Sequence, residues 1–136
     1  MNRVLMHISL TILTIITLTG CDKDVDIADY IDSSKSIELI IRDKADSNSF
    51  LNPKRITILP GDARYSQLIK WGIENAENWK SDIASNTMAD ANIIQGNFYL
   101  NYYLTGYVII NYKDKEGEPN QIKKKVNPDD FQFLFK

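Results

Sequence analysis

Phe98-Tyr-Leu-Asn-Tyr-Tyr-Leu-Thr-Gly-Tyr-Val-Ile-Ile-Asn-Tyr112 is the stretch that decides the fold of this 136-residue chain. Two segments rich in aromatic and β-branched residues flank Leu104-Thr105-Gly106, which predicts a β-hairpin. A two-residue turn would mix polar and apolar residues on each face, whereas a three-residue loop with Gly106 in the left-handed region is a common connection. Because register follows the buried face, we expect the longer loop, which joins three apolar or aromatic pairs: Phe98 with Tyr112, Leu100 with Ile110, and Tyr102 with Val108.

The opposite side of this hairpin is rich in tyrosines and amides. Such side chains combine an apolar body with a polar tip and are well suited to protein contact. The alternative is that the helix or the first strands cover this side, and the sequence leaves both interpretations open. The candidate binding residues here are Tyr99, Tyr103 and Tyr107, with Asn101, Ile109 and Asn111 on the same side.

The segments around the hairpin predict an α+β fold. Apolar residues recur at three and four positions from Ala63 to Trp79, after an N-cap at Asp62, which predicts an amphipathic helix with Trp79 in the core. The order is β-β-α-β-β-β-β, an antiparallel sheet of about five or six strands with the helix on one face. The other strands are expected over 36–43, 55–59, 121–126 and 131–135, with loops over 44–53 and 81–90 and with the terminal phenylalanines completing the core.

The predicted helix also carries a candidate binding site. Trp71 lies about 120° from the centre of the apolar stripe. A tryptophan among amides and an arginine has the composition of a binding hot spot. The alternative is that Trp71 packs under a neighbouring loop. Its neighbours on this side of the helix are Arg64, Gln67, Asn75 and Asn78.

The start of the chain carries a targeting signal. One positive charge at Arg3 precedes an apolar run that is too short to span a membrane comfortably and that suits a signal-peptide core. The run ends at Leu18-Thr19-Gly20-Cys21, which resembles the lipobox of bacterial lipoproteins. The resemblance implies a lipid on the Cys21 sulfur, cleavage just before Cys21, and an anchor in a bilayer. Residues 1–20 are therefore expected to be a signal peptide.

Composition excludes several kinds of chemistry once that signal peptide is removed. The single histidine, His7, would leave with it, and the single cysteine would carry the lipid. Ser-His-Asp and Cys-His catalysis and the usual zinc and haem sites are then ruled out. A net charge of -2 gives no reason to expect nucleic acid. We expect no enzyme, cofactor or metal; catalysis by two carboxylates is the enzymatic alternative.

Residues 21–35 are expected to form an acidic tether between the lipid and the domain. Five aspartates against two lysines in 22–35 indicate a solvated segment that keeps a domain over 36–136 away from anionic head groups. In the lipoproteins of enteric bacteria, Asp after the cysteine favours the inner membrane. Asp22 therefore favours it here, although Lys23 weakens that signal.

Lys123-Lys124-Lys125 is a basic run on a predicted strand. Lysines on a strand at the border of a sheet discourage aggregation and are commonly solvated. The alternative is that the run contacts an acidic partner.

The domain itself resembles a group of small uncharacterised bacterial proteins. The resemblance rests on Ile56-Thr-Ile-Leu-Pro-Gly-Asp62 and on the Tyr65, Leu68, Trp71 and Trp79 spacing. Small lipoproteins of this kind often serve as immunity proteins beside secreted toxins. The resemblance thus implies a non-catalytic, protein-binding domain on the periplasmic side of the cell envelope, with toxin or hydrolase inhibition as its role. The alternatives are an envelope assembly or structural lipoprotein, and a small enzyme or ligand carrier.

Overall fold

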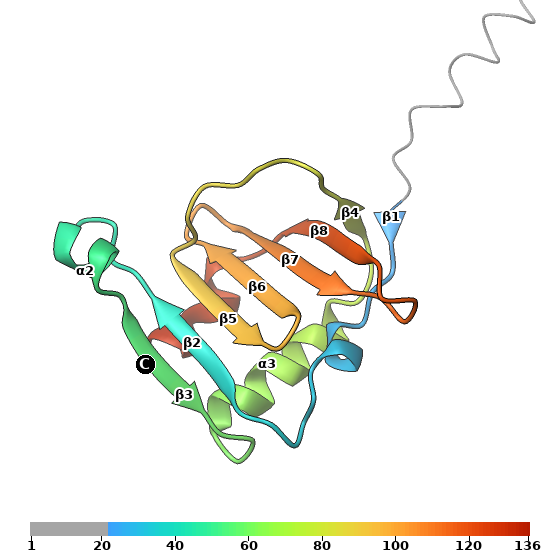
Figure 1. Ribbon diagram of the computed structural model, residues 1–136, viewed down its shortest axis with the longest axis horizontal. Coiled ribbons are helices and arrows are strands. Elements are labelled where there is room, and N and C mark those ends of the chain that lie inside the picture. The colour runs from blue at the N-terminus through green and yellow to red at the C-terminus, as the bar shows by residue number, and fades with distance from the viewer. Residues whose placement is uncertain (1–21) are drawn as a thin grey trace, which may run out of the picture.

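The computed structural model describes residues 22–136 of the chain. The predicted signal peptide, 1–20, and the predicted lipid attachment site, Cys21, lie outside the described residues. Residues 22–136 fold around a single antiparallel sheet with helical segments on one side (Figure 1). This confirms an α+β fold built on one antiparallel sheet.

The strand count and order differ from the prediction. The sheet has eight strands in the order β1-β4-β8-β7-β6-β5-β2-β3. Each neighbouring pair is antiparallel. Their bounds are β1 Asp22–Lys23, β2 Ile37–Ile41, β3 Lys54–Ile58, β4 Trp79–Ser81, β5 Ala91–Gln95, β6 Phe98–Tyr103, β7 Tyr107–Lys113 and β8 Pro119–Lys125.

The hairpin at the centre of the sheet has the predicted register. Leu100 pairs with Ile110 and Tyr102 with Val108 across β6 and β7. Gly106 adopts a φ of 92°, and its N–H donates to the carbonyl of Tyr103 at 2.9 Å. The left-handed backbone is the conformation that the three-residue loop requires, so the turn geometry and the buried face favour the same register.

Strand β5 was not predicted. It joins the hairpin to β2, and it meets β6 through a two-residue turn at Gly96-Asn97. Gly96 has a φ of 57°, which suits a tight hairpin turn. The available sequence signal was the alternation of apolar Ala91 and Ile93 with polar Asn92.

The main helix, α3, ends earlier than predicted. It spans Ala63–Glu74 and begins at Asp62, whose carboxylate accepts from the Arg64 N–H as predicted. Asn75 caps the other end, and its side-chain amide donates to the carbonyl of Trp71. Trp79 is fully buried, as expected, but it lies on β4 and not on the helix.

The predicted last strand is instead a 3-10 helix. Residues Pro128–Phe135 form η2, with the Asn127 side chain accepting from the Asp129 N–H at the start. This cap and a proline in the first turn favour a helical start over an extended one. Because a 3-10 helix repeats every three residues, Phe131 and Leu134 both point into the core.

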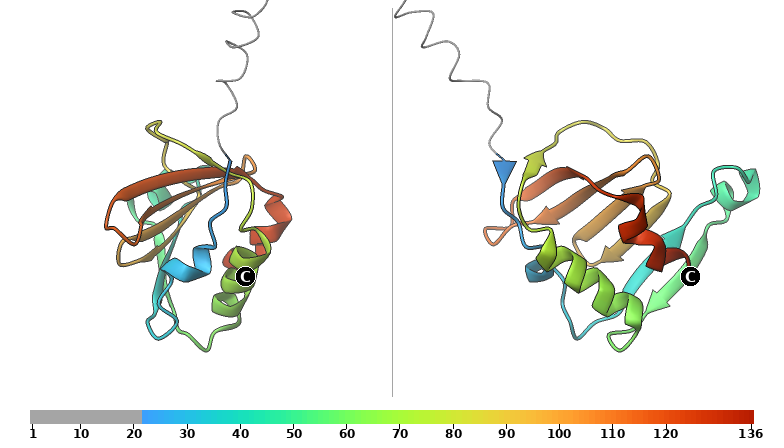
Figure 2. Two further views of the ribbon diagram at one scale, coloured as in Figure 1. Left: turned by 90° about the vertical axis from the view of Figure 1, so that its right-hand side faces the viewer. Right: turned by 180° about the vertical axis from the view of Figure 1, so that it is seen from behind.

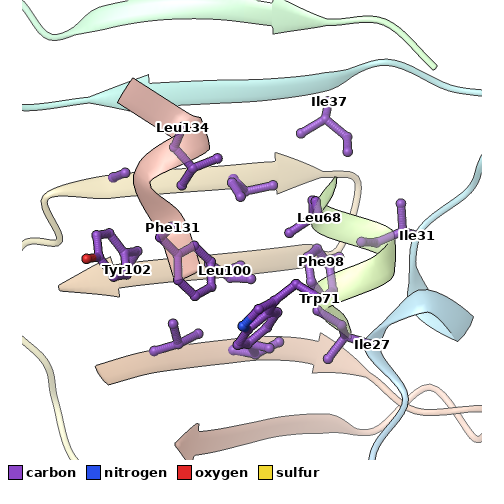
Figure 3. Packing of buried hydrophobic residues seen from close by; sticks show 14 of the residues in the cluster. Ile27, Ile31, Ile37, Leu68, Trp71, Phe98, Leu100, Tyr102, Phe131 and Leu134 are labelled. Atoms are coloured by element: carbon purple, nitrogen blue, oxygen red, sulfur yellow. The ribbon is translucent and has the colours of Figure 1, made fainter. Parts of the chain in front are cut away.

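One face of the sheet, the inner face, carries the core. Helix α3, η2 and the 3-10 helix η1, Ile27–Tyr30, all lie against it (Figure 2). Figure 3 shows Trp71 and Leu68 of α3 packing with Phe131 of η2 over the side chains of β6. The side of the hairpin with the predicted phenylalanine, leucine and tyrosine therefore lies on the inner face.

A short helix, α2, Ser47–Leu51, lies between β2 and β3 inside the predicted loop.

Residues 22–35 belong to the domain, so the tether prediction is wrong for them. β1 pairs with β4, and the Val25 N–H donates to the carbonyl of Ala76 at 2.7 Å. Val25, Ile27 and Ile31 are buried. The aliphatic residues between the aspartates supply enough apolar surface to fix the segment on the core, while most of the carboxylates remain exposed.

Gly72 allows η1 to approach α3 closely, which gives a test of this packing. A Cβ added at Gly72 would overlap the Ile27 Cγ1 and lie 3.0 Å from its Cδ1. We expect Gly72→Ala to lower the free energy of unfolding by about 1–3 kcal/mol, since overpacking outweighs the gain in helix propensity. Urea unfolding measures the effect.

Gly61→Ala is the matched control because nothing lies within 4 Å of its added Cβ. The loss at Gly72 should shrink in an Ile27→Ala background, where the overlapping atoms are gone. Equal midpoints for Gly72→Ala and Gly61→Ala would show that this contact does not constrain the fold.

Candidate functional site

The face of the sheet turned away from α3, the outer face, carries the candidate site. Side chains paired across strands share a face, so the registers define one row across it. This row contains both charged residues and amides. From β1 to β3 it runs Asp22, Lys80, Lys123, Ile109, Asn101, Asn92, Ile40 and Arg55.

A segment that we name the strap, residues 82–90, crosses part of the outer face between β4 and β5 (Figure 1). At its start the Asp82 N–H donates to the carbonyl of Gln121 at 3.0 Å. Near its end Ala89 is buried against Ile109 and Tyr103. The strap therefore covers an apolar patch that the hairpin would otherwise expose.

Asp90 fixes the end of the strap. It is the only buried charged residue found among residues 22–136, with 4% of its surface exposed. Its carboxylate accepts from the Leu104 N–H at 2.9 Å and lies 3.2 Å from the Lys44 ammonium. A buried carboxylate needs such partners, so Asp90 ties the strap to both the hairpin loop and the segment after β2.

The three predicted tyrosines differ in how far they are covered. Tyr103 is only 3% exposed, and its hydroxyl donates to the carbonyl of Thr87 at 2.7 Å. Burial raises the pKa of this hydroxyl. Tyr107 is half-buried and stacks on Tyr103 with ring centroids 4.6 Å apart. Tyr103 therefore holds the strap and is not available as a binding surface, whereas Tyr107 packs beside it and stays partly exposed.

Tyr99 remains open, with 43% of its surface exposed. It lines a shallow hollow of about 400 Å³ on the outer face. The polar lining comes mainly from amides, and the exposed Ile83 of the strap lies on its border. The amides of the hollow are Asn97, Asn111, Asn120 and Gln121.

A second hollow, of about 540 Å³, is lined mainly by lysines of β4 and β8. Lys124 turns toward the end of α3 and donates to the carbonyls of Asn75 and Glu77 at 2.9 and 2.7 Å. Burial lowers the pKa of Lys124. Lys123 instead lies over the Tyr107 ring, with its Nζ 4.4 Å from the centroid. Strand β8 is not an edge strand, because it pairs with β4 on one side and with β7 on the other.

The predicted site on the helix is not present. Trp71 is only 6% exposed and packs against Phe131 and Trp79, with ring centroids 4.6 and 6.2 Å apart. Its indole N–H has no hydrogen-bond partner. Helix α3 is shorter and turned differently from the predicted one, so Trp71 faces the core. This corrects the prediction of a Trp71 hot spot.

The other predicted helix residues serve separate local roles. Arg64 forms an ion pair with Asp62 at 2.7 Å, which holds the pKa of the Asp62 carboxyl at about 2. Asn75 caps α3, and its carbonyl accepts from the Trp79 indole N–H. Asn78 lies beyond the helix with a φ of 62°, and Gln67 is exposed.

The sequence predicted the loop over 81–90 but not its packing on the outer face, and it did not predict β4 or the position of Lys80. Extending the helix to Trp79 hid β4, and with it the position of Lys80 opposite Lys123. The available signal for a break before Trp79 was the asparagine that precedes it. Asn commonly adopts the left-handed region at chain reversals, where a helix ends.

Within residues 22–136, His, Cys, Asp and Glu side chains form no group of three or more that could hold a metal ion. In the same part of the chain, no helix has the length and apolar character needed to cross a membrane.

Comparisons with known proteins found no match: no family model, no curated protein and no solved structure is significantly similar to the chain. The resemblances to bacterial lipoproteins and to a group of small bacterial proteins stay predictions.

The contrast between Trp71 and Tyr99 gives a second test. We expect Trp71→Ala to lower the free energy of unfolding by about 3–5 kcal/mol, as for other buried aromatic residues. Tyr99→Ala should change it by no more than about 0.5 kcal/mol, since half of that ring is already in solvent. Thermal and urea unfolding measure both. An unchanged midpoint for Trp71→Ala would contradict its place in the core.

Proposed function

We propose that this chain is a lipid-anchored protein of the bacterial cell envelope whose domain binds another protein and catalyses no reaction. The lipobox Leu18-Thr19-Gly20-Cys21 supports the anchor. Acyl chains on Cys21 would hold the chain on the periplasmic side of a bilayer, since each buried CH₂ contributes about 0.8 kcal/mol. Asp22 slightly favours the inner membrane.

The open hollow around Tyr99 is the observation that carries the binding proposal. Tyr99, Asn111, Asn120 and Gln121 stand on β6, β7 and β8, three strands that pair continuously at the centre of the sheet, and Asn97 lies in the turn before β6. A tyrosine fixed on such a rigid element loses little conformational entropy on binding and offers both apolar and polar contact. A shallow, amide-rich surface suits a protein partner better than a small ligand, which needs a deeper enclosure.

Inhibition of a secreted toxin or hydrolase is the role that we favour. A preformed surface on an anchored domain would meet such an enzyme where it enters the periplasm. Histidine and free thiols, the groups that most often carry out catalysis, are missing from the chain after Cys21. Envelope assembly is the second candidate, because the same anchor and surface would also suit a constitutive complex.

The anchor predicts the behaviour of a Cys21→Ser variant. We expect this variant to lose palmitate labelling completely when the full-length chain is expressed in a bacterium with an alkyne analogue of palmitate. The hydroxyl cannot replace the thiolate as the lipid acceptor, because it is a much weaker nucleophile at neutral pH. Tyr99→Ala, which leaves the lipobox intact, should be labelled like the natural chain. Label on the Cys21→Ser variant would refute the anchor.

The binding surface predicts which variants lose a partner. The full-length protein is purified from envelopes exposed to secreted proteins of the source bacterium, and its partners are identified by mass spectrometry. We expect Tyr99→Ala to weaken capture by about 2 kcal/mol or more, as for a hot-spot tyrosine. Leu59→Ala is the matched control, since Leu59 is exposed on the turn between β3 and α3.

The identity of the captured protein separates the two roles. A secreted enzyme whose activity falls in the complex supports the inhibitor role, whereas subunits of an envelope complex support assembly. Equal capture by Tyr99→Ala and the natural chain would exclude the Tyr99 hollow as the binding surface.

A further inference from the structure

The border of the sheet formed by β1, β4 and β8 combines positive charge with the start of the described chain. Lys80 projects from β4, and Lys123 and Lys125 project from β8 on the same outer face. Asp22, the first described residue, belongs to β1 at this border. Figure 1 shows the chain entering the fold beside β4.

Two of these lysines are held in an unfavourable arrangement. Lys80 lies directly opposite Lys123 in the β4–β8 register. Like charges in such positions destabilise a sheet. No ion pair found within residues 22–136 involves Lys80, Lys123 or Lys125. An external anionic surface would attract both ammonium groups and would offset the repulsion between them.

The acidic residues nearby do not cancel these charges. Asp22 lies opposite Lys80, and Asp82 lines the lysine hollow. The Asp82 carboxylate, however, accepts from the Gln121 side chain at 3.1 Å and from the Ala84 N–H at 3.3 Å. Three lysines, Lys80, Lys123 and Lys125, therefore face two aspartates, and a net positive charge remains.

Exposed apolar side chains lie at the same end of the molecule. The strap starts from β4 and carries Ile83, whose side chain is fully exposed, and Met88, which is nearly half exposed. The strap and β1 lie at the same end in Figures 1 and 2, opposite the turn between β3 and α3. Lysines beside isolated apolar side chains are the combination by which peripheral proteins contact a bilayer.

We propose that the β1–β4–β8 border and the strap lie against the anionic phospholipid head groups of the membrane that holds Cys21. This inference rests on the proposed lipid anchor. Cys21 directly precedes Asp22, and one residue spans at most about 3.6 Å. With residues 22–35 folded onto the domain, the anchor holds this border within reach of the head groups.

The proposed membrane surface and the Tyr99 hollow adjoin at Asp82 and Ile83, which line one side of the hollow. Tyr99 is on β6, four strands from β1. Neighbouring strands lie about 4.8 Å apart, so Tyr99 is roughly 19 Å from β1 across the sheet. The domain would therefore stand with its lysine border on the bilayer and with Tyr99 farther along the sheet.

The test uses the full-length protein, processed in a bacterium and reconstituted into vesicles of phosphatidylcholine with or without phosphatidylglycerol. Because the single natural cysteine is acylated, Ile83→Cys supplies the one reactive thiol for an environment-sensitive fluorophore. Leu59→Cys, on the turn between β3 and α3, is the matched position. Quenching by head-group spin-labelled lipid reports which position touches the bilayer, and flotation with the vesicles reports the anchor.

We expect quenching at position 83 and none at position 59 in vesicles that contain phosphatidylglycerol. Each lysine near an anionic surface is worth roughly a five-fold change in affinity, so Lys80→Gln, Lys123→Gln and Lys125→Gln together should reduce docking roughly 100-fold and remove the quenching. Salt at high concentration should have the same effect. The matched triple variant Lys54→Gln, Lys70→Gln and Lys136→Gln has the same net charge and should dock normally.

The outcomes distinguish the two proposals. A chain that does not float with the vesicles refutes the lipid anchor. A chain that floats but shows equal quenching at the two positions, or equal effects of the two triple variants, overturns the docking proposal alone. Flotation without quenching at position 83 also overturns it and leaves an acidic protein as the occupant of the lysine border. Circular dichroism melting verifies that every variant is folded.

Discussion

The packing of Phe131 between Trp71 and Tyr102 is the contact on which the rest of the structure depends. Its ring lies 4.6 Å from that of Trp71 and 4.7 Å from that of Tyr102, so one side chain joins η2, α3 and β6. Trp71 also reaches Trp79 on β4. Aromatic side chains bury large areas and favour such edge and offset contacts. Three segments distant in sequence are thereby held on the inner face.

Because the inner face holds the core, the surfaces that we propose for recognition lie on the outer face. The strap covers Ile109 and Tyr103 there and leaves Tyr99 and the lysine hollow open. The two open regions differ in chemistry. Tyrosine and amides suit a protein surface, and the lysines suit phosphates. An anchored domain with both would hold a fixed orientation on the bilayer while it binds a partner.

Predictions from local rules agree with the structure. The register of the central hairpin followed from one glycine and the pairing of apolar residues, and the start of α3 followed from Asp62. Both depend on neighbours a few residues apart. The prediction of a strand over 131–135 was wrong because two local signals conflicted there: the alternating phenylalanines fit a strand, but the Asn127 cap and Pro128 start a helix. Trp71 failed because the faces of α3 depend on which other segments cover the sheet.

The sequence by itself determined the α+β class, the central hairpin and the start of the main helix. It also determined the lipid-anchor prediction, which is a linear motif. Only the tertiary structure decided that residues 22–35 fold onto the domain, that Tyr103 is covered while Tyr99 is open, and that Lys80 faces Lys123. These outcomes depend on contacts between segments far apart in the chain. No local pattern encodes such contacts, because their stability comes from apolar area that the segments bury together.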